Sequence, residues 1–392
     1  MNEVYMIAAK RTPIGGFLGN LAEFSATQLG AIAIKEAFQS VGIDPNTICS
    51  VYMGNVLSAN LGQSPARQAS IFAGISENTD CTTVNKVCAA GMKATIIGAQ
   101  QIQLGLEDLV ITGGMESMSN VPHYNLLRKP VKFGDANCID GLLKDGLTDV
   151  YHNFHMGNAA EMCVEKYDLT REQQDEYALS SYAKAVKATN EGKFKNEIIP
   201  IKINHKTGET IIDYDEDIFK VIPEKVSKLN PVFVKNGTIT AANASNLNDS
   251  AAALLLASKE AVEKYNLKPL AKIISYADAA QAPEWFTTAP SIAITKALKQ
   301  ANLSINDIDF FEINEAYAAV VLANQKILDL DSNKINIYGG AVAMGHPLGA
   351  SGARIICTLI SVLKQEGGKY GVASICNGGG GASAIVIENI NL

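Results

Sequence analysis

The feature that constrains this chain most is an internal duplication. A strand-like run ends at Asn55, and Cys88 follows 33 residues later, before a helix of small residues. A second strand-like run ends at Asn314, and His346 follows it by 32 residues, again before a helix of small residues. A repeat at this distance predicts two similar halves and not a solenoid of short units. Equivalent loops of two packed halves would meet, so we expect Cys88 to face Asn314, His346 and Cys376.

The order of the predicted elements is that of an α/β fold. Strand-like runs at 4–9, 49–58 and 108–114 alternate with helical runs at 26–42 and 91–105. The helix at 91–105 is apolar on nearly every side, which predicts that it is buried. Because strands and helices alternate, we expect sheets that are covered by helices.

A region of different composition interrupts this alternation. Between 119 and 249, charged residues, Pro, Asn and Asp become frequent, and strong helical periodicity is confined to 171–188. The apolar run at 250–265 then predicts a core helix, and 270–280 predicts a strand. These changes predict a first half made of 1–118 with 250–270, an inserted loop domain at 119–249, and a second half at 271–392.

Charge and cysteine content limit the classes of partner. The net charge is −7 and the basic residues form no block, which argues against nucleic acid. The seven cysteines are odd in number and form no C-x-x-C pair, which predicts a reduced, intracellular protein. The chain starts as a strand and ends without a peroxisomal signal, so we expect a cytoplasmic location. No apolar run reaches the ~18 residues of a membrane helix, so we expect no membrane partner.

Two residues stand where a chain can do acid, base or nucleophilic chemistry. Cys88 begins a predicted helix, and a helix N-terminus favours the thiolate, although most buried cysteines are inert. His346 lies in the sequence GHPLGASG, where Pro and Gly fix a loop and an imidazole can act as an acid or a base at neutral pH. A purely structural role in a glycine-rich turn is the alternative for His346.

The sequence CNGGGG at Cys376 offers backbone N–H groups that can hold an oxyanion. A phosphate loop is the rival interpretation, but no G-K-[ST] follows and the spacing of a dinucleotide loop is absent. A metal site built from Cys88, His346 and Cys376 has no ligand-pair spacing to support it. Glu315 is a candidate base or a charge-pair partner, and we favour the latter. We expect a structural role for the remaining cysteines, which are Cys49, Cys81, Cys138, Cys163 and Cys357.

These segments together resemble the thiolase family over nearly the whole chain. The matching motifs are RTPIGGFLG (11–19), GNVLSANLGQSPARQ (54–68), NKVCAAGMKA (85–94), GGMESMSN (113–120), HMG (155–157), GTITAANASNLNDSAAALLL (237–256), NEAYA (314–318), GGAVAMGHPLGASGAR (339–354) and CNGGGGAS (376–383). The residues in these motifs resemble those of acetoacetyl-CoA thiolases more than those of the broad-range degradative branch. Ala90 and Tyr317 depart from this pattern, since relatives often carry Ser and Phe there.

The resemblance implies a fold, an activity and the roles of the central residues. The fold would be two duplicated βαβαβ-type halves in a five-layer αβαβα sandwich with an inserted loop domain. The reaction would be the reversible Claisen condensation of two acetyl-CoA to acetoacetyl-CoA and CoA. Cys88 would carry the acetyl group, His346 would take the thiol proton, and Cys376 would remove a proton from the second acetyl-CoA. Asn314 would position a water with His346, and the N–H groups of Cys88 and Gly378 would hold an oxyanion.

The same resemblance implies contacts to coenzyme A, which would be substrate and product in an enzyme with no obligatory cofactor. The residues that correspond to CoA contacts are His155, Met156, Tyr182, Lys220, Lys225 and Ser245. A potassium site would involve Tyr182, Ala241, Ala242, Ala244 and Val342. The resemblance also implies a homotetramer that is a dimer of dimers.

Three alternatives to this function are considered, and the sequence supports them to different degrees. A broad-range 3-ketoacyl-CoA thiolase is the runner-up within the family. A ketosynthase-like condensing enzyme is disfavoured, because such enzymes replace the second cysteine, here Cys376. A non-catalytic acyl-CoA carrier on the same fold would be expected to lose Cys88 or His346, and both are present.

Overall fold

The computed structural model describes residues 2–128, 131–205 and 208–390, and it confirms the α/β class. The first half contributes a sheet in the order β4-β3-β5-β12-β1, and the second half contributes the order β14-β15-β16-β13. The strands are β1 (Val4–Arg11), β3 (Ser50–Gly54), β4 (Asp80–Val84), β5 (Leu109–Ser117), β12 (Asn248–Ser258), β13 (Ala271–Ala280), β14 (Phe310–Ile313), β15 (Tyr370–Asn377) and β16 (Gly381–Asn389), with β2 (Gly15–Gly16) paired to β12.

The strand order β14-β15-β16-β13 in the second half repeats the order β3-β5-β12-β1 in the first, as the duplication predicts, and β4 is an additional strand of the first half. In each half one strand, β12 or β16, lies antiparallel between two strands that run parallel to each other. The neighbours of β12 are β5 and β1, and those of β16 are β15 and β13. Strands β1 and β13 pair with each other from Val4 to Met6 and so join the two halves. Strands β3 and β14, which end directly before Asn55 and Asn314, are therefore equivalent in the two halves.

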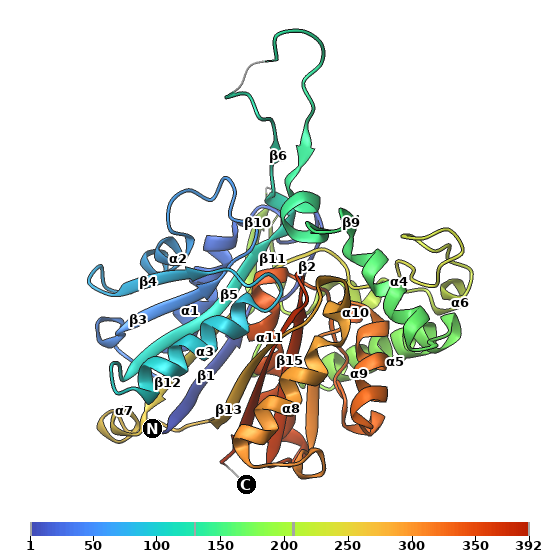
Figure 1. Cartoon of the computed structure of the whole chain (residues 1–392). Helices are drawn as coiled ribbons and strands as arrows, with labels where there is room; N and C mark the ends of the chain where they lie inside the picture. The colour runs from blue at the N-terminus through green and yellow to red at the C-terminus, as the bar shows by residue number, and fades with distance from the viewer. Residues whose placement is uncertain (1, 129–130, 206–207, 391–392) are drawn as a thin grey trace.

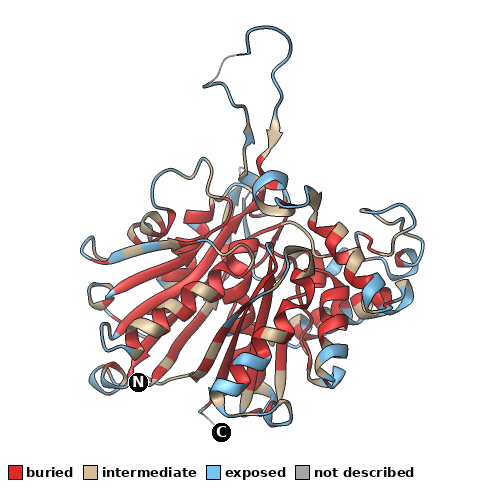
Figure 2. Ribbon diagram, viewed as in Figure 1, coloured by how far each residue is buried: buried red, intermediate tan, exposed pale blue. Residues whose placement is uncertain are grey.

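Helices cover the sheets in layers (Figure 1). Helices α3 (Ala90–Gln103) and α11 (Leu348–Glu366) lie in the middle, where α11 contacts strands of both sheets. Helices α1 (Ala26–Gln39) and α2 (Pro65–Ala73) cover the outer face of the first sheet, and α8 (Ala289–Ala301) and α9 (Ala318–Leu328) lie on the side of the second. The middle layer and both sheets are mostly buried (Figure 2). This is the predicted five-layer sandwich.

The two central helices approach each other closely through glycines. A Cβ atom at Gly91 of α3 would lie 2.8 Å from the carbonyl oxygen of Gly349, and one at Gly352 of α11 would lie 2.5 Å from the backbone nitrogen of Met92. Any larger side chain at these positions would force the helices apart. Since Cys88 and His346 come directly before these helices, the close contact brings the two loops together.

The segment between β5 and β12 holds the remaining long helices and a projecting arm. The arm carries the paired strands β6 (His123–Tyr124) and β7 (Ile139–Asp140) and extends away from the body (Figure 1). The other elements are β8 (Thr148–Asp149), β9 (Phe154–His155), α4 (Met156–Lys166), α5 (Arg171–Asn190), β10 (Ile201–His205), β11 (Gly208–Ile212) and α6 (Pro223–Val226). Helix α5 was predicted from its periodicity, whereas α4 was not.

The core helix expected at 250–265 is wrong. The structure has the central strand β12 there, and only α7 (Lys259–Lys264) is helical. All residues of β12 are buried, because β5 and β1 flank it and helices cover both of its faces. A strand buried on both faces shows no alternation of polar and apolar residues, and its Ala- and Leu-rich sequence also suits a helix.

Over the part of the chain that the structure describes, no helix combines the length and the apolar character that a membrane crossing requires.

Candidate active site

Cys88 stands in a short, strained loop between β4 and α3. Val87, directly before it, has a φ of 48°, which is a rare backbone conformation for a β-branched residue. The backbone N–H of Val87 donates to the Asn85 side chain at 2.9 Å. The Lys86 ammonium contacts Asp278 at 2.5 Å and Ser383 at 2.9 Å, both in the second half. These contacts fix the Cys88 loop against the other half of the molecule.

His346 reaches the same place from the second half. It follows the short helix α10 (Ala341–Met344), and its backbone N–H donates to the Asn248 side chain at 2.9 Å. Nδ1 of the ring lies 2.6 Å from the hydroxyl of Ser351. Nε2 has no hydrogen-bond partner among the described residues, although the side chain is buried. A nitrogen without a partner is therefore available for a reacting group.

A cavity of about 440 Å³ opens between these loops. Cys88, His346 and Gly378 line it, together with the segment from Thr240 to Leu247 and the apolar side chain of Phe286. The backbone N–H of Gly378 donates to the Cys88 sulfur. The cavity is mostly apolar, and the Cys88 thiol and the His346 imidazole are among its polar groups, as is typical of a site for a small molecule.

Cys376 and Asn314 are fully buried and are not among the residues that line the cavity. Cys376 packs in one apolar cluster with Met156, Phe286 and Tyr317, all of which do line it. The Asn314 side-chain oxygen lies 3.4 Å from Arg354 Nη2, and its Nδ2 has no partner among the described residues. The structure thus brings the five predicted catalytic residues to one region, with two of them behind its wall.

The electrostatics of the site keep its groups neutral at rest. Enclosure of the sulfur raises the pKa of Cys88 to about 12, in spite of the hydrogen bond from Gly378. Burial, and then the nearby Arg354 charge, lower the pKa of His346 to about 3. Burial also raises the pKa of Cys376 well above its ordinary value. At neutral pH the site holds two thiols and a neutral imidazole, so the proton of Cys88 must move when the substrate binds.

The comparisons with known proteins decide the family. The family described as "Thiolase, N-terminal domain" matches residues 4–260, and "Thiolase, C-terminal domain" matches residues 267–389. The chain belongs to the thiolase family. The resemblance seen in the sequence is therefore confirmed, and the five-layer sandwich is the thiolase fold.

Individual thiolases are similar to the chain over almost its full length. "Acetyl-CoA acetyltransferase 2" of Arabidopsis thaliana is 53% identical, with 98% of this chain and 97% of the relative covered. "Acetyl-CoA acetyltransferase ERG10, cytosolic" of Gibberella zeae is 52% identical, with 99% and 98% covered. The structure of the Acat5 thiolase of Ascaris suum in complex with coenzyme A has a TM-score of 0.95 and 47% identity, with 99% of this chain and 100% of that one covered.

The residues expected to contact coenzyme A fall into two groups in this thiolase. His155, Met156 and Ser245 line the cavity beside Cys88. Lys220 is more than half exposed and is paired with Glu216 at 2.9 Å and Asp217 at 2.8 Å. The other two, Lys225 and Tyr182, are likewise not among the residues that line this cavity, and Tyr182 faces a separate groove between α5 and the 216–223 segment.

The residues expected to bind potassium also lie in two different places. Tyr182 and Val342 pack in one cluster, whereas Ala241 and Ala244 lie on the wall of the cavity, with Ala242 between them in sequence. Among the described residues, nothing donates a hydrogen bond to the Tyr182 hydroxyl or to the carbonyl oxygens of Ala241 and Ala242. Oxygens without donors fit a monovalent cation, which binds oxygen ligands.

Glu315 has a different role from the charge pairing that we expected. It is fully buried and has no ion pair within the described residues. Its carboxylate accepts hydrogen bonds from the side chains of Tyr177, Ser181 and Asn336 and from the backbone N–H of Val342. Neutral donors therefore satisfy the buried Glu315 side chain, and these hydrogen bonds link α5 to the loop before His346.

Sequence reasoning missed several groups at the site. Ser351 contacts the His346 ring, and its position five residues later in GHPLGASG was the available signal. Glu116 accepts backbone N–H groups of Val56, Leu57 and Gly349, so it links the two halves beside the site. No short-range pattern in the sequence indicates a contact between residues more than 200 positions apart.

Proposed function

We propose that the chain is an acetyl-CoA C-acetyltransferase, which converts two acetyl-CoA to acetoacetyl-CoA and CoA, reversibly. The observation that carries the proposal is the meeting of the Cys88 thiol, the unpartnered Nε2 of His346 and the Gly378 N–H at one cavity. The curated relatives at 52–53% identity bear the name of this activity. The chain is an acyltransferase, and coenzyme A is its substrate and product.

The first half-reaction forms an acetyl-cysteine. The Cys88 sulfur attacks the carbonyl carbon of acetyl-CoA while Nε2 of His346 takes the thiol proton. The N–H groups of Cys88 and Gly378 hold the negative charge on the carbonyl oxygen. When the carbonyl re-forms, the bond to the CoA sulfur breaks, and CoA leaves with the proton from His346.

The second half-reaction forms the carbon–carbon bond. When the second acetyl-CoA binds, His346 takes the thiol proton of Cys376. The Cys376 thiolate then removes a proton from the methyl group, and the water held by Asn314 and His346 steadies the resulting enolate oxygen. The carbanion attacks the acetyl group on Cys88, the carbon–sulfur bond breaks, and acetoacetyl-CoA leaves. The Cys88 thiolate then takes the proton held by His346, and Cys376 keeps the proton that came from the methyl group. The site needs two cysteines because Cys88 carries the acetyl group while Cys376 acts as the base of the second step.

Coenzyme A would lie over the loop domain. His155, Met156 and Ser245 would contact its pantetheine arm, because they line the cavity on that side. Lys220, Lys225 and Tyr182 would contact the nucleotide or its phosphates. The two carboxylates beside Lys220 partly neutralise its charge, so its contribution to phosphate binding would be smaller than that of an unpaired lysine.

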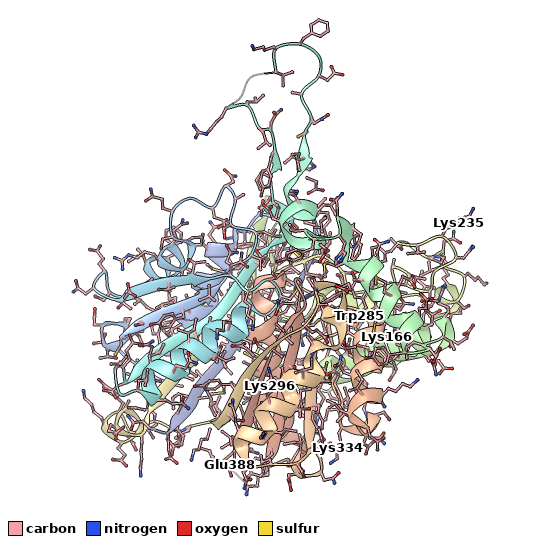
Figure 3. The ribbon with its side chains drawn as sticks, viewed as in Figure 1. Lys166, Lys235, Trp285, Lys296, Lys334 and Glu388 are labelled. Atoms are coloured by element: carbon pink, nitrogen blue, oxygen red, sulfur yellow. The ribbon has the colours of Figure 1, made fainter. Side chains whose placement is uncertain are left out.

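We expect a strong preference for short acyl chains. Phe286, 3% exposed, closes part of the cavity, and its turn is held by Trp285, whose ring centroid lies 3.9 Å from Lys166 Nζ (Figure 3). A long chain would have to displace this packed aromatic group. Thiolysis of acetoacetyl-CoA should therefore exceed that of 3-ketohexadecanoyl-CoA by roughly 10- to 100-fold in kcat/KM. Steady-state kinetics with both substrates measure the ratio.

Two controls accompany this measurement. Phe286→Ala should lower the ratio of kcat/KM for acetoacetyl-CoA to kcat/KM for 3-ketohexadecanoyl-CoA. Phe72→Ala, at an exposed phenylalanine of α2, should leave this ratio unchanged. Equal rates on both substrates in the unchanged chain would replace the proposal by a broad-range 3-ketoacyl-CoA thiolase. Repeating the assay in potassium and in sodium tests the ion site, for which we expect a modest activation by potassium. Identical kinetics in the two salts would remove the ion site alone.

We also propose a homotetramer, a dimer of dimers, in the cytoplasm. The projecting arm supports the assembly, because Phe133 is 99% exposed and Leu126 is 75% exposed there, and such apolar groups favour a covering partner. The seven free cysteines and the cytosolic name of a relative support the location. Sedimentation equilibrium should give four times the 41.7 kDa of one chain, and Phe133→Glu should lower that mass. A mass of two chains would correct the proposal to a dimer, and fractionation of the source cells tests the location.

A further inference from the structure

The orientation of the His346 ring depends on one hydroxyl group. Nδ1 lies 2.6 Å from Oγ of Ser351, in the first turn of α11. That hydroxyl also lies 2.9 Å from the carbonyl oxygen of Pro347. All of these groups are buried, and a hydroxyl carries a single proton. The position of this proton therefore decides which nitrogen of the neutral imidazole carries hydrogen.

Two arrangements of hydrogen are possible. In the first, Ser351 donates to Pro347 and accepts from Nδ1–H, which leaves a lone pair on Nε2. In the second, Ser351 donates to Nδ1, and Nε2–H becomes a buried donor with no acceptor among the described residues. Only the first arrangement persists when His346 takes up another proton, since an imidazolium donates from both nitrogens and needs an acceptor at Nδ1.

The same face of α11 holds Asn314 in an equivalent manner. Arg354, three residues after Ser351 in the helix, places Nη2 3.4 Å from the Asn314 side-chain oxygen. Because the amide oxygen faces the guanidinium, the amide nitrogen points away from it, and that nitrogen has no partner among the described residues. In both cases a buried side chain of α11 contacts one polar atom of a site residue, and the second polar atom of that residue has no partner among the described residues.

We propose that Ser351 is a positioning residue that holds His346 as the Nδ1–H tautomer, with the lone pair of Nε2 directed at the Cys88 thiol. The inference rests on the proposed function, because it gives the base of the acetylation step its orientation. The charged groups around His346 are consistent with a neutral base. Burial, and then the charge of Arg354 on α11, lower the pKa of His346. Glu312 of β14 interacts with the Arg354 charge, and burial raises the pKa of the Glu312 carboxyl to about 8.

The test compares two serine variants of the same helix. Ser351→Ala removes the acceptor, and Ser361→Ala removes a buried hydroxyl that bonds Glu197 at 2.6 Å, far along α11 from His346. We expect acetylation of Cys88, followed as the burst of CoA released from acetyl-CoA, to slow roughly 10- to 100-fold in Ser351→Ala. The KM for acetyl-CoA should change little, and Ser361→Ala should acetylate at the wild-type rate. Equal burst rates in the two variants would overturn the inference.

A measurement on the unchanged protein gives a second test. In protein labelled with ¹⁵N-histidine, the Nε2 resonance that His346→Gln removes should have the shift of an unprotonated nitrogen at neutral pH. A protonated Nε2 would contradict the proposed tautomer. Cys88→Ala serves as the control for the reaction itself. If Cys88→Ala still releases CoA in a burst, the proposed function fails, whereas an unaltered burst in Ser351→Ala alone refutes only the role of Ser351.

Discussion

Incubation with acetyl-CoA is expected to leave an acetyl group on Cys88, and Cys88→Ser is expected to lower turnover roughly 10⁴- to 10⁶-fold. Cys88 lines the cavity, His346 can take its proton, and the Gly378 N–H points at its sulfur. A serine hydroxyl is a much weaker nucleophile next to a neutral imidazole of such low basicity. Mass spectrometry of peptides from acid-quenched protein locates the acetyl group, and a thiolysis assay measures the loss.

Cys49→Ser is the matched control for this experiment. Cys49 is exposed and lies outside the cavity, so the exchange of sulfur for oxygen there should leave both labelling and turnover unchanged. A label on Cys376 with none on Cys88 would reverse the roles assigned to the two cysteines.

The second large effect is expected from Cys376→Ala. The variant should still acetylate Cys88, because Cys376 has no part in the first half-reaction. It should lose the exchange of the methyl protons of acetyl-CoA with deuterium by roughly 10²- to 10⁴-fold, since a positioned base contributes about that much to proton transfer. Nuclear magnetic resonance of acetyl-CoA in D₂O measures the exchange, and condensation should fall in parallel.

Cys163→Ala separates the role of Cys376 from a general effect of removing a buried thiol. Cys163 is in the same apolar cluster as Cys376 and is also fully buried, but it lies on helix α4, whereas Cys376 lies two residues before Gly378, which lines the cavity. We expect it to exchange the methyl protons at the wild-type rate. Wild-type exchange in Cys376→Ala would remove this residue from the mechanism and leave the acetylation of Cys88 intact.

Much of the site was predictable because its residues stand in local motifs. Cys88, His346 and Cys376 each lie beside small residues or glycines, and such runs mark tight loops and close helix packing. The similar spacings of Asn55 to Cys88 (33 residues) and of Asn314 to His346 (32 residues) predicted two matching halves, and the strand order of the second half, which repeats four strands of the first, confirms them.

The features that the sequence did not predict depend on contacts between distant residues. The sequence of β12 predicts a helix because its run of Ala and Leu has no period of two, and it forms a strand because it pairs with the flanking strands β1 and β5. The donors around Glu315 come from α5, from Asn336 and from the backbone of Val342, which no local pattern connects. The hydrogen bond from His346 N–H to Asn248 likewise joins residues 98 positions apart.

The matching positions of Cys88 and His346 also bear on the origin of the chain. Each residue precedes a central helix, α3 or α11, and the two helices meet at glycines where the halves join. An ancestor with identical halves, associated as two separate copies, would have carried the same side chain at both positions. A thiol opposite an imidazole requires two copies that mutate independently, and fusion into one gene permits that. The asymmetric pair at the site could therefore arise only after the ancestral gene was duplicated, and in this chain the two fused copies carry it.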